Sequence, residues 1–139
     1  MITKEALKIE ELAAQATAGG FGAQALFVGV VRDNHEKQVV TAVTYDAFPP
    51  LAEKILAVII SEAEARFEGR VVAAHRLGTL KVGEASVAIA AASPHREEAF
   101  ASCRYVIEEI KKRLPIWKQE HYPDGQNRWL EGCSLEHSG

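Results

Sequence analysis

The segment from residue 84 to residue 114 limits the possible fold more than any other part of the sequence. Glu84–Ala92 is an almost unbroken apolar run, which predicts a buried strand. Ser93 is a good N-cap and Pro94 a good first-turn residue, so a long helix is predicted over His95–Arg113. Apolar residues recur there at spacings of three and four, which predicts one buried stripe through Phe100, Cys103, Ile107, Ile110 and Leu114. A one-sided helix after a buried strand is typical of helices packed on a sheet.

The rest of the chain predicts more strands and helices. Helices are expected at Thr3–Ala18 and, after Pro49 and Pro50, at Leu51–Phe67. The predicted stripe of the second helix follows the 3.6-residue period through Leu51, Ile55, Val58, Ile59, Glu62 and Ala63. Gly29 lies inside a predicted strand, which indicates a bulge or a close backbone approach. Further strands are predicted, the first two paired as a hairpin, at Ala23–Arg32, Val39–Phe48, Arg70–Leu77, Ile116–Tyr122 and Asn127–Glu131. The predicted class is therefore α+β, with two long helices packed on a mainly antiparallel sheet.

The composition indicates one ordered domain. The chain has 139 residues, of which 47% are hydrophobic and 25% charged, as in average globular domains. We expect a single domain over residues 1–139, with residues 1–20 as an N-terminal helix or arm and residues 132–139 as a flexible tail. No apolar run is long enough for a membrane span, and the first residues do not form a secretory signal. The net charge of −3 argues against nucleic-acid binding driven by overall charge.

The cysteines and histidines do not indicate a metal site. Two cysteines are too few for a disulfide scaffold, and without a secretory signal they predict a reduced, cytoplasmic protein. Cys103 falls on the buried helical stripe and is interpreted as packing, whereas nothing positions Cys133. His75 is interpreted as a satisfied histidine of a strand, and His121 and His137 lack partners at metal-ligand spacing.

Cationic residues at the ends of predicted elements are the candidates for a functional site. Arg32 ends a very apolar strand and can face an anion with its planar guanidinium, but a solvated arginine paired with a nearby carboxylate is the simpler interpretation. His95 and Arg96 stand at a helix N-terminus, where free N–H groups and the helix dipole favour an anion. A well-capped, solvated first turn explains this pair equally well.

Two lysines near the end of the same helix have a more specific interpretation. Basic residues in a last helical turn complement the dipole, which explains most of Lys111–Arg113. Lys118 follows Trp117 in a constrained segment after Pro115, where it can be held beside Lys111. Two close ammonium groups lower each other's pKa, and such a lysine can act as an acid, a base or a nucleophile.

The length of the helix bears on the oligomeric state. Arg96 and Lys111 are fifteen residues apart, which is about 22 Å along a helix. One helix therefore cannot bring both into one small-molecule pocket. If the two residues share a site, that site combines the start of this helix from one chain with its end from a second, which predicts a homodimer.

An ordered set of motifs over roughly residues 20–131 resembles one known family, the catalytic (large) subunits of molybdopterin synthase. The matching residues are Phe27-x-Gly29-x-Val31-Arg32 followed by Asp33-Asn34-His35, Tyr45, Glu53-Lys54, His75-Arg76-Leu77-Gly78, Gly83-Glu84, Ser93-x-His95-Arg96-x-x-Ala99-Phe100, Lys111-x-Arg113-x-Pro115-x-Trp117-Lys118-x-Glu120 and Arg128-Trp129.

This resemblance implies a fold and an activity. The fold is an α/β-hammerhead-like domain with a small added β-subdomain. The implied enzyme is a sulfurtransferase of molybdenum cofactor biosynthesis that makes the dithiolene of molybdopterin from cyclic pyranopterin monophosphate. Its sulfur comes from the C-terminal thiocarboxylate of a small ubiquitin-like subunit, so neither a metal nor another cofactor is expected. Two large subunits form a homodimer within a heterotetramer.

The resemblance also implies roles for individual residues. Lys118 is expected nearest the thiocarboxylate tail, with Lys111 as a proton donor or orienting group; both are the expected catalytic residues. The substrate-pocket positions and their flanking residues are Arg32, His95, Arg96, Lys111, Lys118, Phe27, Val31 and Glu120. The His95–Arg96 pair is implied to come from the other subunit of the dimer.

Two departures from the family pattern keep other functions open. The family often has a lysine where this chain has Val30, and a basic residue near Cys133 where this chain has none. A dimeric module that captures the partner's tail without catalysis is one alternative. A small regulatory domain that binds a phosphate ligand through His95 and Arg96 is another.

Overall fold

The structure is a computed structural model that describes residues 1–131, so the predicted tail at 132–139, with Cys133 and His137, lies outside the described residues. The elements in chain order are β1 (Ile2–Thr3), α1 (Ile9–Gln15), β2 (Ala23–Val30), β3 (Asn34–His35), β4 (Gln38–Val39), β5 (Ala42–Ala47), α2 (Pro49–Phe67), β6 (Arg70–Arg76), β7 (Gly78–Lys81), β8 (Ala85–Ser93), α3 (Arg96–Arg113), β9 (Ile116–His121) and β10 (Asn127–Glu131).

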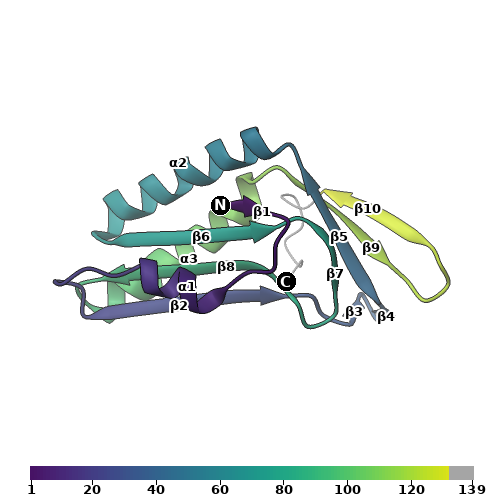
Figure 1. The fold of residues 1–139 in the computed structure, drawn as a ribbon, viewed down its shortest axis with the longest axis horizontal. Coiled ribbons are helices and arrows are strands. Elements are labelled where there is room, and N and C mark those ends of the chain that lie inside the picture. Colours follow the sequence, from purple (N-terminus) through teal and green to yellow (C-terminus); the bar gives the residue numbers. More distant parts are fainter. Residues whose placement is uncertain (132–139) are drawn as a thin grey trace.

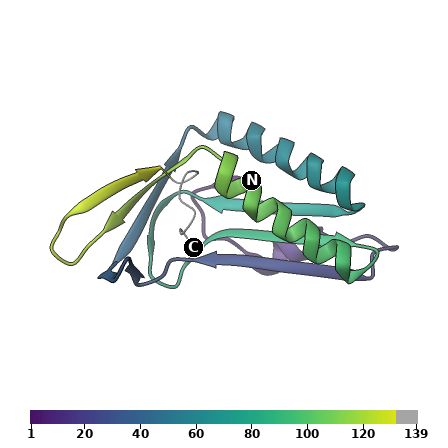
Figure 2. The same ribbon diagram turned by 180° about the vertical axis from the view of Figure 1, so that it is seen from behind.

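The first sheet has the strand order β1-β6-β8-β2 and carries the main core. β1 runs parallel to β6, and the other two pairings are antiparallel. The long helices α2 and α3 lie along one side of this sheet and the short α1 lies on the other (Figures 1 and 2). Val71, Val87 and Ile89 face the helices, while Ala74 and Ala88 pack beneath α1. The period of two along each strand therefore buries both faces of the central strands.

The second sheet has the strand order β10-β9-β5-β7 and is antiparallel throughout. It lies at one end of the first sheet, with its strands steeply inclined to the strands there (Figure 1). This sheet has a separate small core, which is formed by Val31, Val40, Val43 and Leu80. The predicted α+β class, with a mainly antiparallel sheet, two long packed helices and a small β-subdomain, is confirmed.

The predicted N-terminal helix over Thr3–Ala18 is largely wrong. Helix α1 covers only Ile9–Gln15, and Ile2–Thr3 forms a strand beside β6. The amide of Leu77 donates to the carbonyl of Thr3 at 2.7 Å, a long-range bond that a helix there could not make. Pairing to a sheet edge thus outweighs a weak helical stripe.

The predicted hairpin between the first two long strands is also wrong. β2 pairs with β8, whereas β5 pairs with β7 and β9 in the other sheet. The small β3–β4 hairpin lies between them and redirects the chain. Residues 78–81, expected to contain turns, form β7. Gly29 does mark an irregularity: the pairing register shifts after it, and a Cβ there would lie 2.7 Å from Val87 Cγ1.

The helical faces are rotated from those predicted. In α3 Phe100 is 67% exposed, whereas Ala99 and Val106 are buried beside the predicted Cys103, Ile110 and Leu114. The small side chain of Ala99 allows the helix to approach the sheet closely, so size decides the face as much as hydrophobicity. In α2 the buried residues are Ala52, Leu56, Ile59 and Ala63.

Ser93 does not cap α3 as predicted. It is the last residue of β8 and fully buried, and His95 occupies the N-cap position without a side-chain capping bond. The sheet therefore continues one residue further than the capping pattern indicates. Among the described residues no helix combines the length and apolar character needed to cross a membrane.

Candidate functional site

A hollow opens where the second sheet meets the C-terminal end of α3. One part of it is lined by side chains from β5, β6, β8, β9 and α3, among them Tyr45, His75, Ser86, Lys111 and Lys118. The adjoining part shares both lysines and adds residues from the segment after β2, from β3 and from β9, among them Arg32, Asn34 and Glu120. Residues far apart in the sequence thus meet because the two sheets join at this point.

The two lysines lie together in this hollow, as predicted. Lys118 faces inward from β9 and is only 8% exposed, although it is a lysine. Burial, followed by the charges of Lys118 and Arg32, lowers the pKa of Lys111 to about 8. The pKa of Lys118 is also lowered, chiefly by burial and then by Arg32, while Glu120 opposes the shift. Repulsion between cations, the predicted cause, therefore comes second to burial.

The last turn of α3 sends three adjacent basic residues in different directions. Lys111 lines the hollow. Lys112 is solvent-exposed and lies 3.7 Å from Glu109. Arg113 donates to Glu62 on α2 at 2.6 Å and so joins the two long helices. Complementing the helix dipole accounts for Lys112 but not for the half-buried Lys111, which faces the hollow.

Glu120 is the buried carboxylate of the site. Its side chain is 4% exposed, and His35 Nδ1 lies 2.6 Å from its Oε1 atom. The hydroxyl of Tyr122 donates to the same oxygen at 2.8 Å. The guanidinium of Arg128 lies 4.8 Å from the centre of the Tyr122 ring. Glu120 thus accepts hydrogen bonds from two different segments, which suits a buried charge.

His75 and Tyr45 both line the hollow. His75 is buried and its Nδ1 atom lies 2.9 Å from the carbonyl oxygen of Arg76, which makes Nδ1 the protonated nitrogen. Burial is the main cause that lowers the pKa of His75 to about 4, and the charge of Lys111 contributes to the same shift. The Tyr45 ring meets the imidazole edge-on at 5.1 Å. His75 is the satisfied histidine that the sequence indicates, but it also borders the candidate site.

The predicted site residues do not all come together. Arg32, Val31, Lys111, Lys118 and Glu120 line the hollow. Val31 belongs there mainly as packing, because it is 3% exposed and part of the second core. Phe27 lies on β2 and packs against the main core.

His95 and Arg96 lie at the opposite end of α3, beside Gly22 and Ala23 (Figure 2). The helix separates them from Lys111 by about 22 Å, as its length predicts. Within one chain the His–Arg pair and the lysine pair are therefore distinct places.

Sequence reasoning missed the parts of the site that depend on tertiary structure. His35 falls in the matching stretch after Arg32 but receives no role there, and Tyr122 belongs to no matching motif; only the folded chain places both on one carboxylate oxygen. The alternation along Ile116–His121 does carry a signal, since it puts Lys118 and Glu120 on the same face of a strand.

The site can bind an anion and supply protons. It combines a permanently charged guanidinium, one buried and one half-buried ammonium group, and one fixed carboxylate. Cys103 is buried, and burial raises the pKa of its thiol to about 11, so it is a core residue and not an activated nucleophile. In the part of the chain that the structure describes, no group of three or more histidine, cysteine or acidic residues has the arrangement of a metal site.

Comparisons with known proteins show which family the chain belongs to. The sequence model of the MoaE protein family matches residues 2–113. A molybdopterin synthase catalytic subunit from Synechococcus elongatus is 48% identical over 117 residues, which cover 83% of this chain and 71% of the relative. Molybdopterin synthase catalytic subunit 1 from Mycobacterium tuberculosis is 41% identical over 125 residues, which cover 89% of this chain and 85% of the relative.

Solved structures give the same result. The crystal structure of molybdopterin synthase from Staphylococcus aureus superposes with a TM-score of 0.88 at 34% identity, over 93% of this chain and 94% of that one. A chain from the complex of subunits 1 and 2 of molybdopterin-converting factor from Helicobacter pylori superposes with a TM-score of 0.72 at 26% identity, over 99% and 90%. The chain therefore belongs to the MoaE protein family of molybdopterin synthase catalytic subunits, enzymes of molybdenum cofactor biosynthesis.

Proposed function

We propose that this chain transfers sulfur from the C-terminal thiocarboxylate of a small ubiquitin-like subunit to cyclic pyranopterin monophosphate and so builds the dithiolene of molybdopterin. The observation that carries this proposal is the pair of inward-facing lysines, the buried Lys118 and the half-buried Lys111, beside Arg32 in one hollow. Glu120 is the one carboxylate among the described residues that line this part of the hollow, so three cations leave it with an excess of positive charge, which favours a bound anion. A thiocarboxylate tail is such an anion.

The lysines have distinct roles in this proposal. Lys118 contacts the thiocarboxylate, and Lys111 donates or orients a proton. Two thiocarboxylate tails in turn each bond their sulfur to an oxygen-bearing carbon of the pterin, whose carbon–oxygen bond breaks. Water then attacks the tail's carbonyl carbon, the carbon–sulfur bond to the tail breaks, and the two ammonium groups stabilise the negative charge that develops on the acyl oxygen. Water supplies the oxygen that replaces sulfur on the tail. The sulfur comes from the partner, so the proposal requires neither a cysteine nucleophile nor a metal cofactor. The free Cys103 thiol is consistent with a reducing, cytoplasmic setting.

The phosphate of the pterin requires further cations. Arg32, His95 and Arg96 can supply charge-assisted hydrogen bonds to it. Because His95 and Arg96 lie about 22 Å along α3 from the lysines, we propose that they reach the site from a second copy of the chain.

Two features of the surface support a homodimer. Phe100 is 67% exposed and lies one helical turn from Arg96, so a copy that covers Phe100 also approaches the His95–Arg96 end. β2 is an edge strand of its sheet, and it leaves Leu26 and Val30 about half exposed. Uncovered apolar edges of this kind favour association. The complete enzyme is proposed to be a heterotetramer with two small subunits.

Reconstitution tests the proposal. The chain is mixed with the thiocarboxylated small subunit and cyclic pyranopterin monophosphate, and the dithiolene product is measured as its oxidised fluorescent derivative. We expect product from the natural chain, and at least about a hundredfold less from Lys118→Ala and from Lys111→Ala, because both cations act on the reacting groups.

Lys112→Ala is the matched control. Lys112 neighbours Lys111 on the same helical turn but points to solvent, with its side chain 72% exposed. It should leave the rate unchanged. If the natural chain binds the small subunit firmly and yields no product, the chain is a tail-binding module instead. If both lysine variants unfold, the lysines are structural.

A further inference from the structure

The β3–β4 hairpin beside the site is held in a strained conformation. Its turn residues Glu36 and Lys37 both have left-handed backbones, with φ of 51° and 69°. A two-residue turn of this kind favours Asn-Gly, and other residues there cost free energy that contacts elsewhere must offset. A contact between this hairpin and the cationic hollow can provide that offset.

The hairpin contributes His35. This residue comes just before the turn and its side chain is only 11% exposed. Its Nδ1 atom meets Glu120 Oε1 at 2.6 Å across 85 residues of sequence. Because a carboxylate only accepts hydrogen bonds, the histidine nitrogen is the donor. His35 thus fastens the hairpin to β9, and Arg32 lies three residues before it in the same segment.

Glu120 in turn acts on Lys118. The two residues alternate with Gln119 on β9, so both face the hollow. The charged and titratable groups around Lys118 come from every neighbouring element: Arg32 after β2, Tyr45 on β5, His75 on β6, Lys111 on α3 and Glu120 on its own strand. Glu120 supplies the negative charge in this set and opposes the fall in the pKa of Lys118.

We infer that His35 is a positioning residue for sulfur transfer: its hydrogen bond holds the Glu120 carboxylate beside Lys118 and keeps that lysine charged to receive the anionic tail. The inference deepens the proposed function and rests on it for the reaction, but the ionisation of Lys118 can be measured without any substrate. Tyr122 holds the same carboxylate oxygen from the other side, at 2.8 Å.

The test follows the side-chain nitrogen signal of Lys118 by NMR in the lysine-labelled chain, assigned by its absence in Lys118→Ala. In His35→Phe, which keeps the ring but removes the donor, we expect the titration midpoint of Lys118 to fall by about one pH unit. His35→Asn should restore the natural midpoint, because its amide N–H takes the place of Nδ1–H. Glu120→Gln gives the size of the complete effect.

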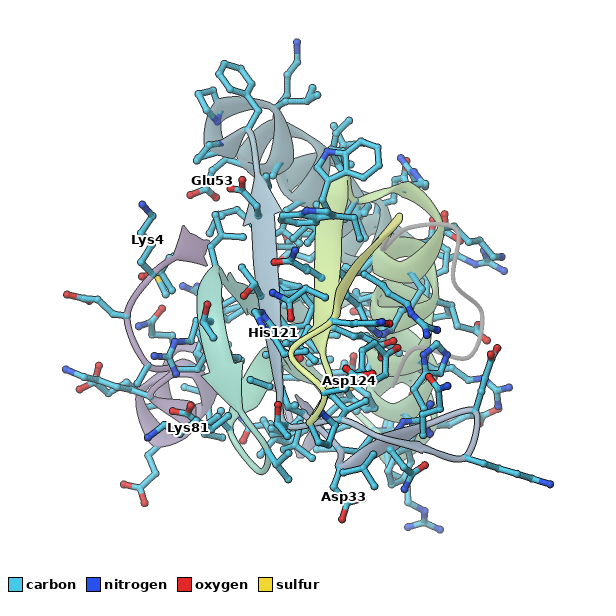
Figure 3. All side chains as sticks on the ribbon, turned by 90° about the vertical axis from the view of Figure 1, so that its right-hand side faces the viewer. Lys4, Asp33, Glu53, Lys81, His121 and Asp124 are labelled. Atoms are coloured by element: carbon cyan, nitrogen blue, oxygen red, sulfur yellow. The ribbon has the colours of Figure 1, made fainter. Side chains whose placement is uncertain are left out.

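His121→Ala is the matched control. His121 is also a hydrogen-bonded histidine, with its Nε2 atom 2.7 Å from Thr44 Oγ1, but it lies on the outer face of the same sheet (Figure 3). It should leave the midpoint of Lys118 unchanged. If His35→Phe does not fold, Glu36→Asn and Lys37→Gly are added to relieve the turn, and the same measurement is made in that background.

In the reconstituted enzyme, the alkaline limb of the kcat profile should move down by the same interval in His35→Phe. The inference is overturned if Glu120→Gln lowers the titration midpoint of Lys118 while His35→Phe leaves that midpoint unchanged. If the natural enzyme transfers no sulfur, the proposed function fails, while the Lys118 titration still decides whether His35 acts through Glu120.

Discussion

At the scale of single residues, the site is defined by side chains whose burial conflicts with their charge. Lys118 and Glu120 are both nearly buried on adjacent inward positions of one strand. Their burial is tolerable because each faces opposite charge or hydrogen-bond donors. The sequence predicts both residues from their position and from the resemblance, but not His35, whose role exists only once the hairpin folds onto β9.

His75 gives a prediction for stability against pH. Its pKa is about 4 in the folded chain and 6.5 in a free histidine, so between these values the unfolded chain binds more protons. Stability should therefore fall as pH drops from 6.5 to 4, by up to about 3 kcal/mol. Urea denaturation at a series of pH values measures this loss.

His75→Gln should flatten the stability profile in that interval, whatever it does to stability at pH 7, and His121→Ala should retain the slope. An undiminished slope in His75→Gln would mean that other groups cause the acid sensitivity.

At the scale of elements, the period of a helix is easier to predict than the face it buries. The bounds of α2 and α3 come close to those expected, because Pro49, Pro94 and Pro115 mark three of the four ends. The buried face is decided by fit to the sheet. Small residues such as Ala52 and Ala99 are preferred there, and larger ones such as Leu51 and Phe100 remain outside.

Strand pairing is also beyond what the pattern can specify. β5 alternates clearly, but nothing in its own residues indicates that it pairs with β7 and β9 instead of β2. That choice depends on the β3–β4 hairpin, which redirects the chain, and on the second core that Val40 and Val43 join. The composition of the site is equally hard to predict from the sequence, because the site forms where the two sheets meet.

The corrected face of α2 can be tested by two substitutions. Leu56 is 1% exposed and lies off the predicted stripe, whereas Val58 is 41% exposed and lies on it. Leu56→Ala should lower the free energy of unfolding by about 3 kcal/mol, because it leaves a cavity in the core. Val58→Ala should change it by less than about 0.5 kcal/mol. Urea denaturation distinguishes the two substitutions. Equal losses of unfolding free energy would mean that Val58 lies on the buried face of α2, as the sequence pattern predicts.

At the scale of the whole molecule, the account predicts that neither chain of a dimer holds a complete site alone. The lysine hollow and the His95–Arg96 pair lie at opposite ends of α3. The exposed Phe100 lies near the His95–Arg96 end, and the open edge of β2 runs from beside that pair to the hollow. Closed twofold association uses the same surface on both copies and therefore produces two equivalent shared sites.

Mixing two inactive variants tests this central claim most directly. Lys118→Ala and Arg96→Ala chains are combined, allowed to exchange subunits, and assayed with the thiocarboxylated small subunit and the pterin. Each mixed dimer then has one site with both defects and one intact site, so random mixing should recover about a quarter of natural activity. Failure to recover activity, with subunit exchange demonstrated and the natural chain active, or full activity in a strictly monomeric chain, would contradict the account.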